Sequence, residues 1–126
     1  MADPPKVRWL DEPEDKDYAA AHSYLSLLVG AAELDPLIAQ LREAPAGRWR
    51  AKDILRAARL PLLSAKQSEE VAEKLAKVRD KEALSPILLV VLRADVVAQI
   101  ADGYHRTCAA FLTSEDSLVP GRIAFL

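Results

Sequence analysis

The segment from Asp102 to Arg106 brings together groups that could hold a phosphate. Gly103 can adopt a positive φ or let a ligand approach the backbone. His105 and Arg106 offer side-chain donors, and the arginine presents them as a bidentate fork. A strand that ends at Gly103 ahead of a helix leaves free backbone N–H groups at the helix start, where the macrodipole favours an anion. The segment therefore predicts a phosphate-binding turn.

The carboxylate of Asp102 adds a second requirement to this site. A bare phosphate would repel it, so Asp102 is expected to hold a metal, orient His105 or accept a hydrogen bond from a ligand hydroxyl. The alternative is that Asp102 is only a helix N-cap, Gly103 a turn residue, and His105 and Arg106 surface residues of a first helical turn. The spacing alone leaves both interpretations open.

The elements around this turn are predicted from apolar runs and breakers. Ile87–Leu92 and Val96–Ile100 are β-branched and aliphatic runs only three residues apart, which predicts a hairpin buried on both faces. His105–Leu112 has helical composition. Pro120-Gly121 is expected to precede a last strand, Arg122–Leu126. The end of the chain thus forms a strand-strand-helix-strand unit.

Helical periodicity dominates the first half of the chain. The spacing predicts a short strand at Val7–Leu10 and then helices over Tyr18–Val29, Asp35-Pro36 to Ala44, Lys52–Arg59, and a segment after Ser64 with the stripe Val71, Leu75 and Val78. Asp17 is the expected cap of the first of these helices, and Ser64 with Gln67 forms the capping box of the last. The Glu70–Lys74 and Glu73–Lys77 pairs on the last helix are expected on a solvated face.

The fold class that follows is α+β in a single domain of 126 residues. Its first part, about 1–63, is mainly helical, and its second part, about 64–126, contains the strand-strand-helix-strand unit. No internal repeat or long linker divides the chain.

The second part resembles a known superfamily. Leu84-Ser85-Pro86-Ile87-Leu88-Leu89-Val90, then a strand ending in Ile100-Ala101-Asp102-Gly103-Tyr104-His105-Arg106, then an alanine-rich helix, is similar to the ParB/sulfiredoxin superfamily. In that superfamily the strand-to-helix loop binds the phosphates of CTP in partition proteins, and of ATP or ADP in sulfiredoxins and free-serine kinases. The resemblance implies a small mixed sheet with helices. It also implies that Gly103, Tyr104, His105 and Arg106 contact phosphate and that the Ser85-Pro86 turn approaches the same ligand.

Two departures from that superfamily limit the expected chemistry. Tyr104 occupies the position of the catalytic cysteine of sulfiredoxins, so sulfinic-acid reduction is not expected, and Cys108 is interpreted as a small buried residue. Partition proteins carry Gly-Glu-Arg-Arg in this loop, together with a helix-turn-helix domain and a dimerisation region. Here Tyr104-His105 replaces the acidic-basic pair and 126 residues leave no room for these additions, so we expect no chromosome-partition role.

Charge and composition restrict the partners. The net charge of −2 gives no global attraction to nucleic acid or to anionic membranes. Arg48-Trp49-Arg50 with Lys52 is a basic-aromatic cluster that could touch nucleic acid, but Trp49 is expected at the edge of the core. A single cysteine excludes a disulfide framework and a multi-cysteine zinc site, and neither a signal pattern nor a membrane-length apolar run is present. We expect a cytoplasmic protein with no membrane or nucleic-acid partner and no metal bound by the protein alone.

Three functions are compatible with these residues. The leading hypothesis is a nucleotide- or phosphate-binding ParB-like domain whose ligand is CTP, ATP or ADP with Mg²⁺, or another small phosphorylated molecule. The second is a small-molecule phosphotransferase resembling the free-serine kinases, with Asp102 as the catalytic residue. The third is a non-catalytic regulatory or interaction domain with a decayed site, whose helices from Tyr18 to Leu63 form the working surface.

Overall fold

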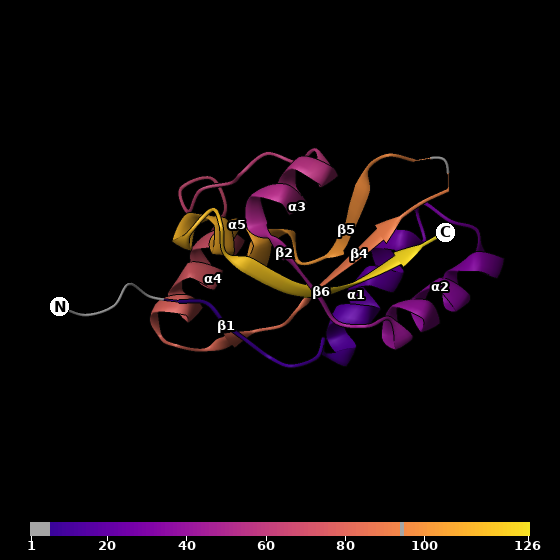
Figure 1. Cartoon of the computed structure of the whole chain (residues 1–126), viewed down its shortest axis with the longest axis horizontal. Coiled ribbons are helices and arrows are strands. Elements are labelled where there is room, and N and C mark those ends of the chain that lie inside the picture. The colour runs from indigo at the N-terminus through magenta and orange to yellow at the C-terminus, as the bar shows by residue number, and fades with distance from the viewer. Residues whose placement is uncertain (1–5, 94) are drawn as a thin grey trace.

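The computed structural model of the chain describes residues 6–93 and 95–126 and has the mixed α+β fold expected from the sequence (Figure 1). Residues 1–5 and 94 lie outside the described part. The expectations for the N-terminus and for the connection between the two predicted strands fall on these residues. The elements in chain order are β1 (Arg8–Trp9), α1 (Asp15–Leu25), α2 (Ala31–Glu43), β2 (Gly47–Arg50), α3 (Ala51–Ala58), α4 (Glu69–Arg79), β3 (Ala83–Leu84), β4 (Ile87–Val91), β5 (Ala98–Asp102), α5 (Tyr104–Thr113) and β6 (Leu118–Phe125).

A four-stranded sheet in the order β2-β6-β4-β5 forms the centre of the described part. β4 and β5 are antiparallel and form the hairpin predicted from the sequence. β4 also pairs in parallel with β6, because α5 returns the chain across the sheet before β6 begins. β2 pairs antiparallel with β6 at the other edge. β1 and β3 form a separate two-stranded parallel sheet.

Helices cover both faces of this sheet, and the alternation along β4 shows why (Figure 1). Leu88 and Val90 are buried in a cluster with residues of α1 and α2. Ile87 and Leu89 point to the opposite face and are buried in a cluster with residues of α3 and α5. Successive side chains of a strand point to opposite faces, so a strand buried on both faces must be apolar throughout. The predicted two-sided burial of the hairpin is confirmed for β4.

Two helix starts differ from those predicted. Asp17 is not the cap of α1, because Glu14 is the N-cap and Asp17 is the third helical residue, where the two carboxylates form a reciprocal capping box. α1 ends at Leu25 instead of Val29. α2 begins at Ala31 instead of Pro36, so the proline lies inside the helix and removes one backbone donor there. Burial of Leu34 extends the predicted apolar stripe toward the earlier start.

One further helix start and two strands also differ from the prediction. Ser68, not Ser64, caps α4, because its side chain accepts from the N–H of Val71; the predicted Ser64–Gln67 contact closes a turn before the helix. The sequence does not predict β2, because β6, the strand with which it pairs, lies about 70 residues later in the chain. β6 begins at Leu118 and includes Pro120. Pro120 lies opposite Arg48 of β2, and the pairing of β6 with β4 begins at the next residue, Gly121. The N–H that proline lacks is therefore not needed between β6 and β4.

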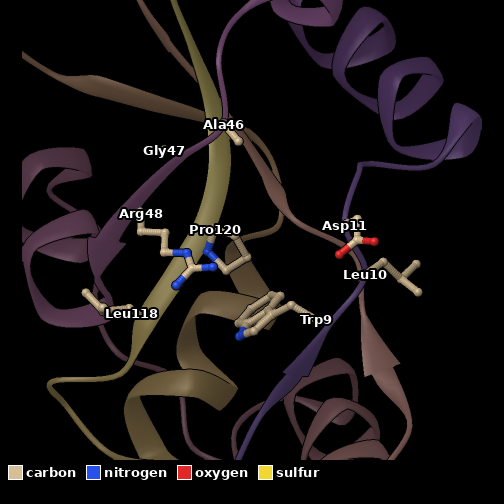
Figure 2. A pocket seen from close by; sticks show the side chains of 8 residues that line it. All are labelled: Trp9, Leu10, Asp11, Ala46, Gly47, Arg48, Leu118 and Pro120. Carbon is tan, nitrogen blue, oxygen red and sulfur yellow. The ribbon is translucent and has the colours of Figure 1, made fainter.

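Several predicted details are confirmed. Cys108 is fully buried, as expected of a small core residue, and burial raises the pKa of its thiol. Trp49 is partly buried against a core cluster, as predicted. Trp9 of β1 packs against the same cluster and also faces Arg48 and Pro120 across a space between the two sheets (Figure 2). None of the helices in the described residues combines the length and the apolar character that a membrane span requires.

Candidate functional site

The turn from Asp102 to the first residue of α5 is built by a bulge followed by a glycine. The pairing of β5 with β4 shifts between Leu88 and Leu89, so that Ala101 has no partner of its own on β4 and Asp102 is the last strand residue. Gly103 follows with φ +112°. A Cβ added there would lie 2.4 Å from Cγ2 of Ile87. Both the backbone angle and the close approach to Ile87 therefore require glycine.

The start of α5 has no side-chain cap. Gly103 is the N-cap, and no side chain of residues 6–93 and 95–126 accepts from a backbone N–H of the first turn, so the interpretation of Asp102 as the capping residue is wrong. The first intrahelical backbone bond runs from the N–H of Thr107 to the carbonyl of Gly103 at 3.0 Å. The N–H groups ahead of Thr107 have no acceptor within the helix, and the positive end of the macrodipole lies with them. An anion would be stabilised at this position.

A cavity of about 200 Å³ opens at this helix start. Its wall comes from the predicted turn and from one face of α4: Glu70, Lys74, Asp102, Gly103, Tyr104, His105 and Arg106. The structure thus brings five of the six predicted site residues together around one space. The local elements explain this arrangement, because α4 packs along α5 through buried Val71 and Cys108.

Glu70 and Lys74 are the cavity residues that the sequence analysis did not find. They were expected to pair on a solvated face, but the ion pair of Lys74 is with Glu73 at 3.5 Å, and its side chain is only 21% exposed. The predicted Glu73–Lys77 pair is confirmed at 3.9 Å. The position of Lys74 in the sequence could have indicated its burial. It follows Val71 by three residues and precedes Leu75, so it lies beside the buried stripe of α4.

Tyr104, His105 and Glu70 also shape the cavity. The rings of Tyr104 and His105 stack with centroids 5.3 Å apart, and the Tyr104 hydroxyl donates to the carbonyl of Pro61 at 2.5 Å. Glu70 accepts from Ser68. Hydrogen bonds from its own backbone N–H and from Ser68, with the nearby His105 and Lys74, hold the pKa of Glu70 below its usual range. The cavity therefore contains a charged carboxylate beside its cationic groups.

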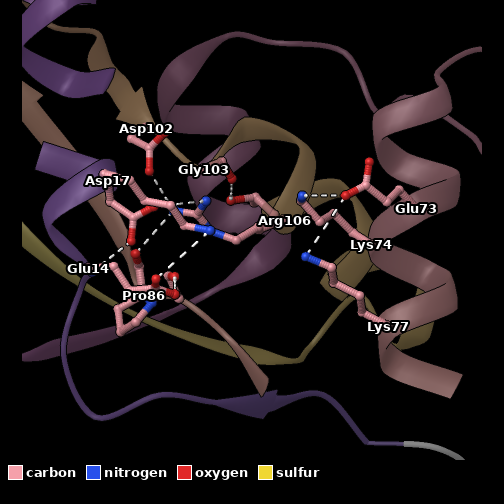
Figure 3. Close-up of polar contacts among 12 residues, drawn as sticks. Glu14, Asp17, Glu73, Lys74, Lys77, Pro86, Asp102, Gly103 and Arg106 are labelled. Carbon is pink, nitrogen blue, oxygen red and sulfur yellow. Dashed lines mark hydrogen bonds and ion pairs between the residues drawn. The ribbon is translucent and has the colours of Figure 1, made fainter. Parts of the chain in front are cut away.

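Arg106 lies at the base of the turn with its guanidinium already bound (Figure 3). One terminal nitrogen donates to the carboxylate of Asp102 at 2.7 Å and to the carbonyl of Pro86 at 3.2 Å. The other terminal nitrogen lies 3.6 Å from the carboxylate of Asp17. The side chain is 11% exposed, and its Nε is buried without a partner among the described residues. Direct phosphate binding by Arg106, as predicted, would have to use the guanidinium N–H groups that these three acceptors leave free.

Asp17 and Asp102 share this one guanidinium. Asp17, which the sequence analysis assigned to helix capping alone, is 3% exposed and also accepts from the backbone N–H of Glu14. Burial raises the pKa of Asp102, the charge of Arg106 opposes that rise, and the neighbouring carboxylate of Asp17 adds to it. Two carboxylates on one cation in a partly buried place favour the protonated form of one of them.

Ser85 is the predicted site residue that the structure does not bring to the cavity. It is 6% exposed, donates to Glu14 at 3.0 Å and is not part of the cavity wall. The Ser85-Pro86 turn reaches the site through the carbonyl of Pro86, which accepts from Arg106. Within residues 6–93 and 95–126, no group of three or more histidine, cysteine, aspartate or glutamate side chains could hold a metal ion.

Comparison of the chain with protein-family models, with curated proteins and with solved structures finds no match. The superfamily resemblance of the turn and its flanking strands therefore rests on the sequence pattern alone.

Proposed function

We propose that the cavity at the start of α5 binds the phosphate of a small phosphorylated ligand, with CTP, ATP and ADP as the ligands that the superfamily resemblance favours. The observation that carries the proposal is an uncapped helix N-terminus that opens into a 200 Å³ cavity walled by Lys74 and His105. Free backbone donors, the helix dipole and a partly buried ammonium group all favour an anion there. In this proposal the fold around the cavity is a ParB/sulfiredoxin-like sheet with helices.

The residues divide into those that face the ligand and those that hold the turn. The backbone of Gly103 and the side chains of Lys74 and His105 face the cavity and supply donors. Arg106 is a positioning residue, because its hydrogen bonds join Asp102 of β5 to the carbonyl that precedes β4. Its ion pair with Asp17 adds α1 to the same support.

The two carboxylates in the cavity wall favour a ligand that is more than a bare phosphate. Glu70 and Asp102 would repel an unaccompanied dianion. They suit a ligand that also presents hydroxyl donors, or a phosphate accompanied by Mg²⁺, since Mg²⁺ is usually held by substrate phosphates, water and one or two protein carboxylates. This requirement favours a magnesium nucleotide over free phosphate.

Isothermal titration calorimetry tests the proposal. Wild-type protein is titrated with CTP, ATP and ADP, each with Mg²⁺, and with inorganic phosphate. At least one nucleotide should bind more tightly than phosphate. If none of the four probes binds at millimolar concentration, the proposal is wrong.

A matched pair of lysines locates the binding. Lys74→Ala removes the ammonium group from the cavity and should weaken binding by a factor of about ten or more, the value of a charge-assisted hydrogen bond. Lys77→Ala is the control, because Lys77 lies on the same helix and contacts the same Glu73 without forming part of the cavity wall. Equal losses in the two variants would show that the phosphate binds elsewhere.

A further inference from the structure

A second cavity, of about 260 Å³, lies between the two sheets on the side of β1, β2 and β6 (Figure 2). Its wall consists of Trp9, Leu10, Asp11, Ala46, Gly47, Arg48, Leu118 and Pro120. None of these residues lines the cavity at α5, so the two spaces are separate.

Trp9 provides a flat aromatic wall for this cavity. Its indole packs partly against a core cluster, and Arg48 and Pro120 are directed toward it from β2 and β6 (Figure 2). A neighbouring cavity of about 320 Å³ also has Trp9 and Leu118 in its wall, so the indole borders open space in two directions. An indole with an accessible face is a surface on which another planar ring can stack.

Opposite charges lie on this cavity without being paired. Neither Arg48 nor Asp11 forms an ion pair with another described residue. Their neighbours do so: Glu12 contacts Arg122 at 3.9 Å, and Lys52 contacts Asp116 at 2.9 Å. A guanidinium beside an aromatic wall is suited to bind a planar anion by a bidentate contact.

The strand geometry explains why Arg48 works with Trp9 and not with its neighbour in sequence. Arg48 and Trp49 are consecutive in β2, so their side chains point to opposite faces. Trp49 packs with Ile54 in the α3 cluster, and Arg48 is left exposed toward β1. The basic-aromatic cluster of the sequence is thus divided between two faces of β2. Arg48 instead lies beside Trp9, which is about 40 residues earlier in the chain.

We propose that this cavity binds a small planar aromatic anion, a single ring system that carries a carboxylate or a phosphate. The ring stacks on Trp9, the anionic group pairs with Arg48, and Asp11 accepts from ring N–H donors. The volume decides the size class, because ligand cavities usually range over roughly 300–1,000 Å³ and this one, at about 260 Å³, is below that range. An extended molecule would not be enclosed.

The test compares each charged ring with its neutral counterpart. AMP and adenosine form the phosphate arm, and indole-3-carboxylate and indole form the carboxylate arm, all measured by calorimetry on the full chain. At least one anion should bind about tenfold or more tightly than its neutral counterpart, and the arm that responds identifies the anionic group. If neither anion binds better than its neutral counterpart, the proposal is overturned.

Substitutions in β2 then assign the binding to this cavity. Arg48→Ala should reduce the affinity for the anion to that for the neutral ring. Arg50→Ala is the matched control, because Arg50 is exposed on the same strand but does not line the cavity. Because AMP can also bind at the α5 cavity, both variants are also made in the Lys74→Ala background, where the effect of Arg48→Ala should persist. Equal effects of Arg48→Ala and Arg50→Ala, or loss of the Arg48→Ala effect in the Lys74→Ala background, would place the anion elsewhere.

Discussion

Arg106 contacts three segments of the chain, through Asp17, Pro86 and Asp102. Its single positive charge faces two carboxylates. If Asp17 and Asp102 are both ionised, the partly buried group has one excess negative charge. A partly buried excess charge is costly, and protonation of one carboxylate relieves the cost. Burial is the largest cause of the raised pKa of Asp102 and the nearby charge of Asp17 adds to it, whereas the charge and the hydrogen bond of Arg106 oppose it.

This arrangement predicts the pH dependence of the Asp102→Asn variant. The folded-state pKa of Asp102 is above its unfolded value of about 3.9, so its stabilising contribution is fully present below that value and is lost as the pH rises through the folded pKa. Asparagine does not titrate. The free energy of unfolding of the wild type minus that of the variant should therefore fall from pH 3.5 to pH 7 in urea titrations.

Asp116 provides a control of opposite sign. Its hydrogen bond and ion pair with Lys52 lower the pKa of its carboxyl group. Its contribution is present above the unfolded pKa and is lost as the pH falls, so the same difference measured with Asp116→Asn should rise with pH. A difference for Asp102→Asn that is flat, or that rises in parallel with that of Asp116→Asn, would contradict the account of the Asp17–Arg106–Asp102 group.

The residues of the turn could be found from the sequence, but their partners could not. Asp102, Gly103, His105 and Arg106 are consecutive or nearly so, and a strand-turn-helix pattern is a local signal. Lys74 and Asp17 reach the same place from other helices, and only tertiary packing brings them there. Ser85 shows the converse: it is close to the turn in space, but its hydroxyl is directed to Glu14.

At the level of elements, α4 supplies Glu70 and Lys74 to the cavity wall, so its first turn matters to the site. Ser68 accepts from the N–H of Val71 at 3.2 Å and is the cap of this helix. Ser68→Ala should lower the free energy of unfolding by about 1 kcal/mol, the usual cost of losing a capping side chain. Urea denaturation followed by circular dichroism measures this change.

Ser64→Ala is the matched variant, because the sequence pattern favours Ser64 as the cap. In the structure Ser64 contacts Gln67 through its backbone: its N–H donates to the Gln67 side chain and its carbonyl accepts from the N–H of Gln67. The alanine variant keeps both contacts. Its free energy of unfolding should stay within about 0.5 kcal/mol of the wild type, as for most surface substitutions. A larger cost for Ser64→Ala than for Ser68→Ala would show that the helix starts earlier than described.

Element predictions succeeded where the signal was local and failed where pairing was distant. The hairpin, α3 and α5 follow from apolar runs and from the prolines and glycine around them. β2 has only four residues, alternates between half-buried and exposed, and depends on β6 for its pairing. A preceding helix stop at Pro45 and Gly47 was visible in the sequence, but nothing local indicated the strand that follows it.

At the level of the whole molecule, the two parts distinguished in the sequence are interleaved. α1 and α2, from the first part, cover Leu88, Val90 and Ala101 of the second. β2, also from the first part, completes the sheet by pairing with β6. The α+β class was predictable from the order of helical and strand patterns, but this interleaving was not, because it depends on contacts between distant segments.

Interleaving predicts that the chain unfolds as one unit. Trp9 and Trp49 both belong to the first part, so their fluorescence reports on it, whereas α4 and α5 of the second part contribute to the far-ultraviolet circular dichroism. The two signals should show one coincident transition in urea. A fragment of residues 64–126 should remain unfolded, because it would expose the apolar face of β4 and β5 that α1 and α2 cover and would leave the β2 side of β6 unpaired. Separate transitions, or a fragment that unfolds cooperatively by itself, would show instead that the second part is an independent domain to which the helices are added.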